Sequence, residues 1–326
     1  MLIDSYDRVH SYLRISITDH CNLRCFYCMP EEEYQFMPNP KLMQANEIVE
    51  IAKIFVANGI NKIRLTGGEP LVRKDAAQII RELGKLNVEL TITSNATRVH
   101  HFIDDFENAG IRSVNISLDT LKKEKFQLIT RRDQFETVKN NIHLLLERNF
   151  EVKVNVVVIK GLNDLEIPDF IEWTKNYPIQ VRFIEFMPFD GNQWNSNKLV
   201  TWHEILDIIS DKYKIEVGEN EPHETGKNYR IKNHKGSFAV ISTMSAPFCS
   251  GCNRIRLTAD GKIKNCLFSQ EETDLLQAFR NGKDLMQLIK QSIASKHKEL
   301  GGQFTKEFNK IDTQHLHNRS MIAIGG

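Results

Sequence analysis

Six cysteines fall into two sets of three near opposite ends of the 326-residue chain. Three thiolates leave one iron of a [4Fe–4S] cluster without a protein ligand, whereas clusters that only carry electrons usually have four cysteines. An open iron can bind a substrate, so each set is a candidate for a cluster that takes part in chemistry. The sets are Cys21-x3-Cys25-x2-Cys28 and Cys249-x2-Cys252-x13-Cys266.

Zinc is the alternative ligand for both sets. Structural zinc takes four ligands, typically in pairs spaced by two to four residues. His20 is a possible fourth ligand in the first set, but its adjacency to Cys21 makes simultaneous binding awkward. A zinc ribbon that lacks its fourth ligand is more plausible at the second set. Paired with a first cluster, a second cluster with an open iron is the better interpretation.

Two arginines follow the second set directly. Arg254 and Arg256 are two residues apart on an expected strand, so they share one face of it. Arginine forks match phosphate oxygens bidentately. The alternative is a pair of solvated arginines on an edge strand, but a position beside a cluster ligand favours an anion site. With a formal net charge of +1, the chain is not expected to bind nucleic acid or membranes in bulk, so such a site must be local.

Strand-like and helix-like segments alternate over the first two thirds of the chain. Six β-then-α units imply a parallel sheet, because parallel neighbours need crossover helices. The expected strands are 12–18, 62–66, 89–93, 113–118, 151–159 and 180–187, and the expected helices are 46–58, 75–86, 99–109, 134–149, 166–176 and 201–212.

The expected strands alternate polar and apolar residues, as in Arg14 against Leu13 and Ile15. A parallel sheet covered on both faces would have continuous apolar strands instead. One face must therefore line a wet or charged space. We predict an α/β fold with a partial (β/α)6 TIM-like barrel, helices outside and a polar lumen inside. Only the sixth strand departs from this pattern, because Arg182 is followed by an odd-spaced Glu185.

The pattern changes after about residue 215. Short strands are expected at 229–231, 237–241, 254–257 and 262–265, with an Asp260-Gly261 turn between the last two, and helices at about 274–281 and 283–296. We therefore predict two domains. Residues 1–215 would form the partial barrel, and residues 216–326 a smaller C-terminal α+β domain that holds the second iron–sulfur cluster and ends in Gly325-Gly326.

The first cysteine set, with Tyr27 before its last cysteine, resembles the signature of the radical S-adenosylmethionine superfamily. The segment Thr66–Pro70 resembles the superfamily's Gly-Gly-Glu-Pro motif, although a Gly-Gly pair by itself also suits a simple turn. This resemblance implies that S-adenosylmethionine chelates the open iron and that an electron from the cluster releases a 5′-deoxyadenosyl radical.

Over nearly its whole length, the chain resembles the GTP 3′,8-cyclase family (molybdenum cofactor biosynthesis protein A), which has two [4Fe–4S] clusters. The resemblance implies conversion of GTP to (8S)-3′,8-cyclo-7,8-dihydroguanosine 5′-triphosphate, after the radical abstracts the ribose C3′ hydrogen. The first cysteine set, Arg254 and Arg256 would be catalytic. The implied S-adenosylmethionine contacts are Tyr27, Gly68, Ser117 and Met187, and the implied GTP contacts are Arg14, Arg64, Thr93, Lys153, Arg254 and Arg256.

The resemblance also implies a flavodoxin or ferredoxin as electron donor, a downstream cyclic pyranopterin monophosphate synthase, a homodimer and a Gly-Gly tail in the pocket. A cytoplasmic location is expected because the first ten residues have no apolar core and no stretch approaches 18 apolar residues. One departure from the family is Asn95-Ala96 in place of Asn-Gly, which puts a positive-φ turn in doubt. Two alternatives remain: a radical enzyme that modifies a peptide, and a non-catalytic iron–sulfur electron-transfer or binding protein.

Overall fold

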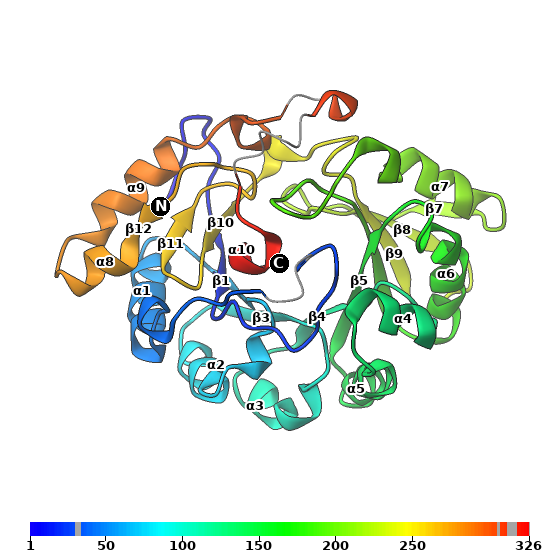
Figure 1. Ribbon diagram of the computed structural model, residues 1–326, viewed down its shortest axis with the longest axis horizontal. Helices are drawn as coiled ribbons and strands as arrows, with labels where there is room; N and C mark the ends of the chain where they lie inside the picture. The colour runs from blue at the N-terminus through cyan, green and yellow to red at the C-terminus, as the bar shows by residue number, and fades with distance from the viewer. Residues whose placement is uncertain (30–33, 305–306, 312–317, 326) are drawn as a thin grey trace.

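One twelve-stranded sheet curves through the computed structural model, which describes residues 1–29, 34–304, 307–311 and 318–325 (Figure 1). The strand order is β12-β11-β10-β1-β2-β3-β4-β5-β6-β9-β8-β7, and the strands from β10 through β9 are parallel. The sheet is therefore an open barrel whose edges are β12 and β7. The first six strands are β1 (Tyr12–Ser16), β2 (Lys62–Thr66), β3 (Glu89–Ser94), β4 (Ser113–Ser117), β5 (Glu151–Val158) and β6 (Ile179–Glu185).

Helices cover the outer face of the curved sheet, as the β-then-α pattern predicts (Figure 1). Helix α4 (Lys123–Thr130) is an element that the sequence pattern did not indicate, and it precedes α5 in the crossover between β4 and β5. The other outer helices are α1 (Ala45–Ala57), α2 (Ala76–Gly84), α3 (Ile103–Asn108), α5 (Phe135–Glu147), α6 (Ile167–Asn176) and α7 (Trp202–Ser210).

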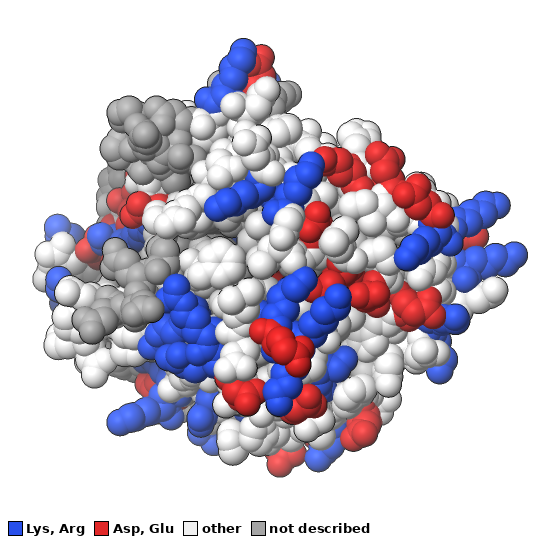
Figure 2. Space-filling model, turned by 45° about the vertical axis from the view of Figure 1, so that its right-hand side comes forward, with Lys and Arg blue, Asp and Glu red and all other residues white. Residues whose placement is uncertain are grey.

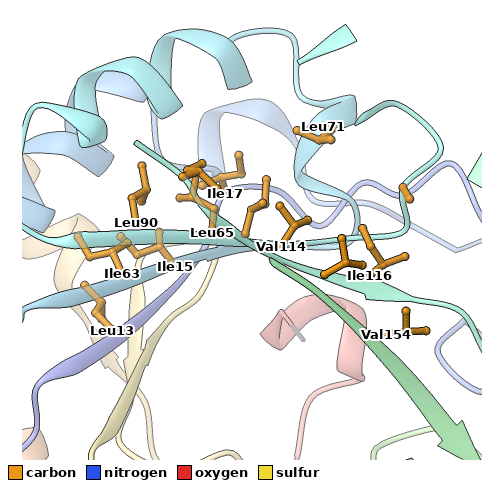
Figure 3. Close-up of a cluster of buried hydrophobic side chains, with 14 of the residues drawn as sticks. Leu13, Ile15, Ile17, Ile63, Leu65, Leu71, Leu90, Val114, Ile116 and Val154 are labelled. Atoms are coloured by element: carbon orange, nitrogen blue, oxygen red, sulfur yellow. The ribbon is translucent and has the colours of Figure 1, made fainter. Parts of the chain in front are cut away.

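The hydrophobic core lies between this outer face and the helices. Figure 3 shows Leu13, Ile15, Ile63 and Leu65 side by side on β1 and β2, and all four are fully buried. Each strand alternates, so the residues between them face the lumen. The predicted α/β partial barrel is confirmed, and burying one face of each strand is what aims the polar face inward.

β6 keeps this alternation to its end, contrary to the expected irregularity. Glu185 is fully buried and shares the face of β6 that carries Val181 and Phe183. Its Oε1 accepts a hydrogen bond from the backbone N–H of Trp202 at 2.9 Å, and its Oε2 accepts from Met244 at 2.7 Å and Ser245 at 2.9 Å. The carboxylate thus ties the start of α7 to the segment after β9.

The C-terminal strands extend both edges of the barrel sheet. β9 pairs with β6 and β10 pairs with β1, in both cases in parallel. The division at residue 215 stays a prediction, and the later strands lie within the same sheet as the barrel. These strands are β7 (Ile215–Val217), β8 (Lys227–Ile231), β9 (Ser237–Ile241), β10 (Arg254–Leu257), β11 (Lys262–Lys264) and β12 (Thr273–Asp274), and the late helices are α8 (Leu275–Arg280), α9 (Leu285–Ala294) and α10 (Met321–Ile324).

The surface carries mixed charge. Figure 2 shows Lys and Arg interspersed with Asp and Glu over most of the face in view, together with one compact basic group. None of the helices in the described part of the chain has the length and apolar character needed to cross a bilayer.

Candidate active site

A cavity of about 320 Å³ opens in the lumen of the barrel. All six cysteines lie in its lining, together with side chains from both polar strand faces and the loops that follow them. The two cysteine sets are more than 200 residues apart in the chain, and the curvature of one sheet brings them to the same space. This convergence makes the lumen the candidate active site.

The first cysteine set lies in the loop after β1, at the carboxyl end of the barrel strands. Burial raises the pKa of the Cys21 thiol to about 11 and that of Cys28 to about 12, and it places the pKa of Cys25 well above its usual range. Burial thus disfavours the thiolate forms here, and a bound cation would stabilise them. Iron supplies such a positive charge.

The Thr66–Pro70 segment packs directly against the cysteine loop. A Cβ atom on Gly68 would lie 2.5 Å from the carbonyl oxygen of His20, so only glycine fits there. Glu69 accepts hydrogen bonds at Oε1 from Ser94 Oγ at 2.9 Å and at Oε2 from the Asn95 N–H at 2.6 Å. Burial raises the pKa of Glu69 to about 7, although these donors oppose the rise. Glu69 had no predicted role of its own, but its carboxylate connects two loops of the site.

The four predicted S-adenosylmethionine contacts, Tyr27, Gly68, Ser117 and Met187, all line the cavity. The Tyr27 hydroxyl donates to Asp119 Oδ2 at 2.5 Å, and the Val157 N–H donates to Asp119 Oδ1 at 2.9 Å. Burial raises the pKa of Asp119 to about 6. Sequence reasoning missed Asp119, although its place two residues after β4 is where barrel strands present functional groups.

The second cysteine set faces the same cavity from the other side, in a cationic setting. Burial alone raises the pKa of Cys252, but Arg254 and Lys296 lower it to about 6. Lys296 Nζ lies 3.4 Å from Cys252 Sγ, and the Leu300 N–H lies 3.5 Å from Cys249 Sγ. The sulfur ligands of the second set therefore have hydrogen-bond donors already in place.

Arginines from three adjacent strands form a row on the lumen face. The sheet register places Arg14 of β1 beside Arg256 of β10 and Arg64 of β2. Burial and the charge of Arg14 lower the pKa of Arg256 to about 9. Nitrogen atoms of Arg14, Arg64 and Arg254 are buried and have no hydrogen-bond partner among the described residues. Such a row is complementary to a polyanion.

Four of the six predicted GTP contacts line the cavity: Arg14, Thr93, Arg254 and Arg256. Arg64 and Lys153 are not among the described lining residues. Arg64 donates from Nε to the Tyr12 hydroxyl, and Lys153 Nζ lies 3.4 Å from Glu151 Oε2. Their roles toward a nucleotide stay predictions.

Arg182 of β6 is a lining residue that sequence reasoning did not propose as a substrate contact. Its Nη2 donates to Thr225 Oγ1 at 3.1 Å, and burial together with Arg64 and Arg14 lowers its pKa to about 10. Its place on the polar face of β6 could have identified Arg182 as a residue of the lumen. Arg182 adds a cation on the side of the lumen opposite β10.

The C-terminal segment enters the lumen, where Figure 1 shows α10 inside the curve of the sheet. Arg256 Nη1 donates to the Gly325 carbonyl at 2.7 Å, and a Cβ atom at Gly325 would lie 2.6 Å from Thr66 Oγ1. Gly325 thus fits the tail position predicted for it, whereas Gly326 lies outside the described residues. Arg319, just before α10, pairs with Asp260 at 2.9 Å.

The turn at Asn95-Ala96 keeps the positive-φ geometry that alanine in place of glycine put in doubt. Ala96 adopts φ 62°, the left-handed conformation that glycine would occupy without strain, and its methyl group is fully buried. Asn95 Nδ2 donates to Asn22 Oδ1 at 2.9 Å and lies 3.8 Å from Cys21 Sγ. Replacement of glycine by alanine therefore keeps the turn and its contact with the cysteine loop.

The cysteine sets fit clusters better than single ions. Among the described residues, no three His, Cys, Asp or Glu side chains converge closely enough to hold one metal ion. Each thiolate of a four-iron cluster binds a different iron, so cluster ligands lie further apart than those of zinc. All six cysteines are free of disulfides and face the cavity, as two three-thiolate sites require.

Comparisons with known proteins agree with this geometry. The Radical SAM superfamily model matches residues 15–174, and the Molybdenum Cofactor Synthesis C model matches residues 179–301. The Streptococcus suis protein SuiB bound to S-adenosylmethionine has a similar fold, with a TM-score of 0.66 over 97% of this chain and 77% of SuiB, at 15% identity. That identity shows the fold alone.

Curated relatives match along at least nine tenths of the chain. It is 45% identical to the mitochondrial GTP 3′,8-cyclase of Arabidopsis thaliana, over 100% of this chain and 84% of the relative. It is 44% identical to GTP 3′,8-cyclase of Listeria welshimeri, over 91% of both. It is 43% identical to molybdenum cofactor biosynthesis protein 1 of Dictyostelium discoideum, covering all of this chain but 52% of the relative, so it spans about half of that longer protein. The chain belongs to the GTP 3′,8-cyclase family of radical S-adenosylmethionine enzymes.

Proposed function

We propose that this protein converts GTP to (8S)-3′,8-cyclo-7,8-dihydroguanosine 5′-triphosphate, the first step of molybdenum cofactor synthesis, with S-adenosylmethionine and two [4Fe–4S] clusters. One observation carries the proposal: both cysteine sets line one cavity together with Arg14, Arg254 and Arg256. The relatives named GTP 3′,8-cyclase support the same substrate.

The first cysteine set would hold the cluster that binds S-adenosylmethionine. The reduced cluster with S-adenosylmethionine bound would supply the 5′-deoxyadenosyl radical, which takes the C3′ hydrogen of GTP in the proposed reaction. Tyr27 and Asp119 form a hydrogen-bonded pair that fixes the wall beside this cluster. The close contact of Gly68 with His20 holds the glycine segment against the cysteine loop.

The second set and the arginines would hold the nucleotide. Arg14, Arg254 and Arg256 provide guanidinium groups around one part of the cavity, and a triphosphate supplies the negative charge that they lack. With its phosphates there, the guanine would reach the cluster held by Cys249, Cys252 and Cys266. The enclosed lumen limits access of water and orients the ribose toward the first cluster.

The experiment uses anaerobically purified protein reconstituted with iron and sulfide, then reduced and supplied with S-adenosylmethionine and GTP. Mass spectrometry should find 5′-deoxyadenosine together with a cyclised isomer of GTP. Arg254→Ala should weaken GTP binding, and S-adenosylmethionine cleavage should persist. Arg81→Ala, at an exposed position on α2, is the matched control and should change neither. Deoxyadenosine without any change in GTP would contradict the substrate.

The peptide-modifying alternative has a structural basis, because SuiB has also been crystallised with its precursor peptide. That likeness, at 15% identity, extends only to the fold. The buried arginine row favours a phosphorylated substrate, because a peptide would leave these charges unbalanced. Isothermal titration with GTP distinguishes the two substrates, because a peptide-modifying enzyme should not bind GTP.

The same proposal includes a flavodoxin or ferredoxin as electron donor and a cyclic pyranopterin monophosphate synthase that takes up the product. It also includes a homodimer in the cytoplasm. The donor, the synthase and the dimer rest on the resemblance to the family alone, and sedimentation velocity tests the dimer directly.

A further inference from the structure

Lys296 is a buried lysine that contacts the second cysteine set. It follows α9 and is 3% exposed. Its Nζ lies 3.4 Å from Cys252 Sγ and donates to the backbone oxygen of Arg254 at 3.0 Å. Within the described residues, Lys296 forms no ion pair with a carboxylate; its hydrogen-bond partners are these two atoms.

A buried ammonium group without an anion is strongly destabilising. The Arg254 carbonyl supplies a dipole but no charge. Arg254 itself adds a further positive charge near Cys252. Among the described residues, the anion that contacts Lys296 is therefore the Cys252 thiolate of a bound cluster, with the negative charge that the cluster brings. This contact gives the burial of the lysine a physical reason.

The two cysteine sets differ in the donors and charges that reach their sulfurs. In the first set, Cys21 receives a neutral donor, Asn95 Nδ2 at 3.8 Å, and the buried carboxyl groups of Glu69 and Asp119 act on the set, with Arg24 opposing Glu69 at Cys21. In the second set, Glu299 acts on Cys249, but Cys252 receives an ammonium group directly, from Lys296 at 3.4 Å. One-electron reduction adds negative charge to a cluster, so cations and N–H donors at its sulfurs raise its reduction potential, and carboxylates lower it.

We propose that Lys296 is a positioning residue that acts through Cys252: its ammonium group sets the reduction potential of the second cluster above that of the first. The inference rests on the proposed function, because it requires the second cluster. The sequence alone predicts no role for Lys296, because a lysine at the end of a helix is ordinarily a solvated side chain.

The test is a redox titration of the reconstituted full-length protein, followed by electron paramagnetic resonance. Iron and sulfide contents are measured first. A parent in which Cys21, Cys25 and Cys28 are replaced by Ala isolates the second cluster, and unaltered protein is titrated in parallel. Lys296→Met removes charge and donor, Lys296→Gln keeps a donor, and Lys296→Arg keeps the charge. Lys298→Met, two residues away and exposed, is the matched control.

Lys296→Met should make reduction of the second cluster at least tenfold less favourable, which for a one-electron couple is a shift of about 59 mV to more negative potential. Lys296→Gln should shift it in the same direction by less. Lys296→Arg and Lys298→Met should stay at the parent value. An unchanged midpoint in both neutral variants overturns the role of Lys296 alone. A parent protein that binds iron only at the first set overturns the proposed second cluster as well.

Discussion

Arg256→Met should stabilise the nucleotide-free protein and at the same time weaken GTP binding. Arg256 is 7% exposed, with Arg14 beside it on β1, and its pKa falls from 12.5 to about 9 because burial and the neighbouring arginines disfavour its charge. At 1.36 kcal/mol for each tenfold change in the protonation equilibrium, this fall corresponds to about 5 kcal/mol of unfavourable energy in the free protein. Methionine removes that cost and fills similar space.

Two effects reduce the gain. The hydrogen bond from Arg256 to the Gly325 carbonyl is lost, which costs about 1 kcal/mol. Relaxation of the neighbouring arginines already lowers the repulsion in the native protein. We therefore expect a net stabilisation of about 1–3 kcal/mol, which for a chain of this size is a rise in melting temperature of about 1.5–4.5 °C. Loss of one buried guanidinium–phosphate pair should weaken GTP binding by about 2 kcal/mol or more, roughly 30-fold.

The assay is anaerobic differential scanning fluorimetry of reconstituted protein, with and without GTP, beside isothermal titration with GTP. Arg81→Met, on the exposed face of α2, is the control and should change neither quantity. A lower melting temperature in the absence of GTP would refute the reasoning that the arginine row destabilises the free protein. Unchanged GTP affinity would remove Arg256 from the substrate site.

Three further predictions test other parts of the site. Burial raises the pKa of Tyr12, but Arg14 and Arg64 outweigh it and lower this pKa to about 7. Between about pH 7 and 10 the unfolded chain therefore binds more protons than the folded protein, so the free energy of unfolding should rise with pH in this window. Thermal melts of Tyr12→Phe should no longer show this rise. Ala96→Gly should change the free energy of unfolding by less than about 1 kcal/mol, because relief of the left-handed strain offsets the lost methyl group. Ala52→Gly, equally buried but in α1, should cost about 2 kcal/mol. Equal losses for the two variants in chemical denaturation would contradict the strain at Ala96. Cys25→Ala should abolish 5′-deoxyadenosine formation measured by chromatography, and survival of cleavage would remove Cys25 as a ligand of the first cluster.

Much of the fold was predictable from residue patterns alone. The alternation of Arg14 with Leu13 and Ile15 defined a strand with one polar face, and repetition of that pattern indicated a lumen. Cysteine spacing indicated two three-ligand sites. These features are local: period and spacing are fixed within a few residues, so the sequence shows them directly.

Other features required the tertiary structure. Periodicity gives a strand's faces but not its neighbours, so it could not show that β9 and β10 extend opposite edges of one sheet. Nor could it show that Glu69 reaches Asn95, because that contact depends on loops meeting at the end of the barrel. Lys296 shows the difference most clearly. Its sequence neighbourhood predicts a solvated side chain, yet packing of the segment after α9 buries its charge against Cys252, 44 residues earlier in the chain. The sequence by itself determined which groups are available for chemistry, and the tertiary structure decided which of them share a dielectric environment and therefore act on one another.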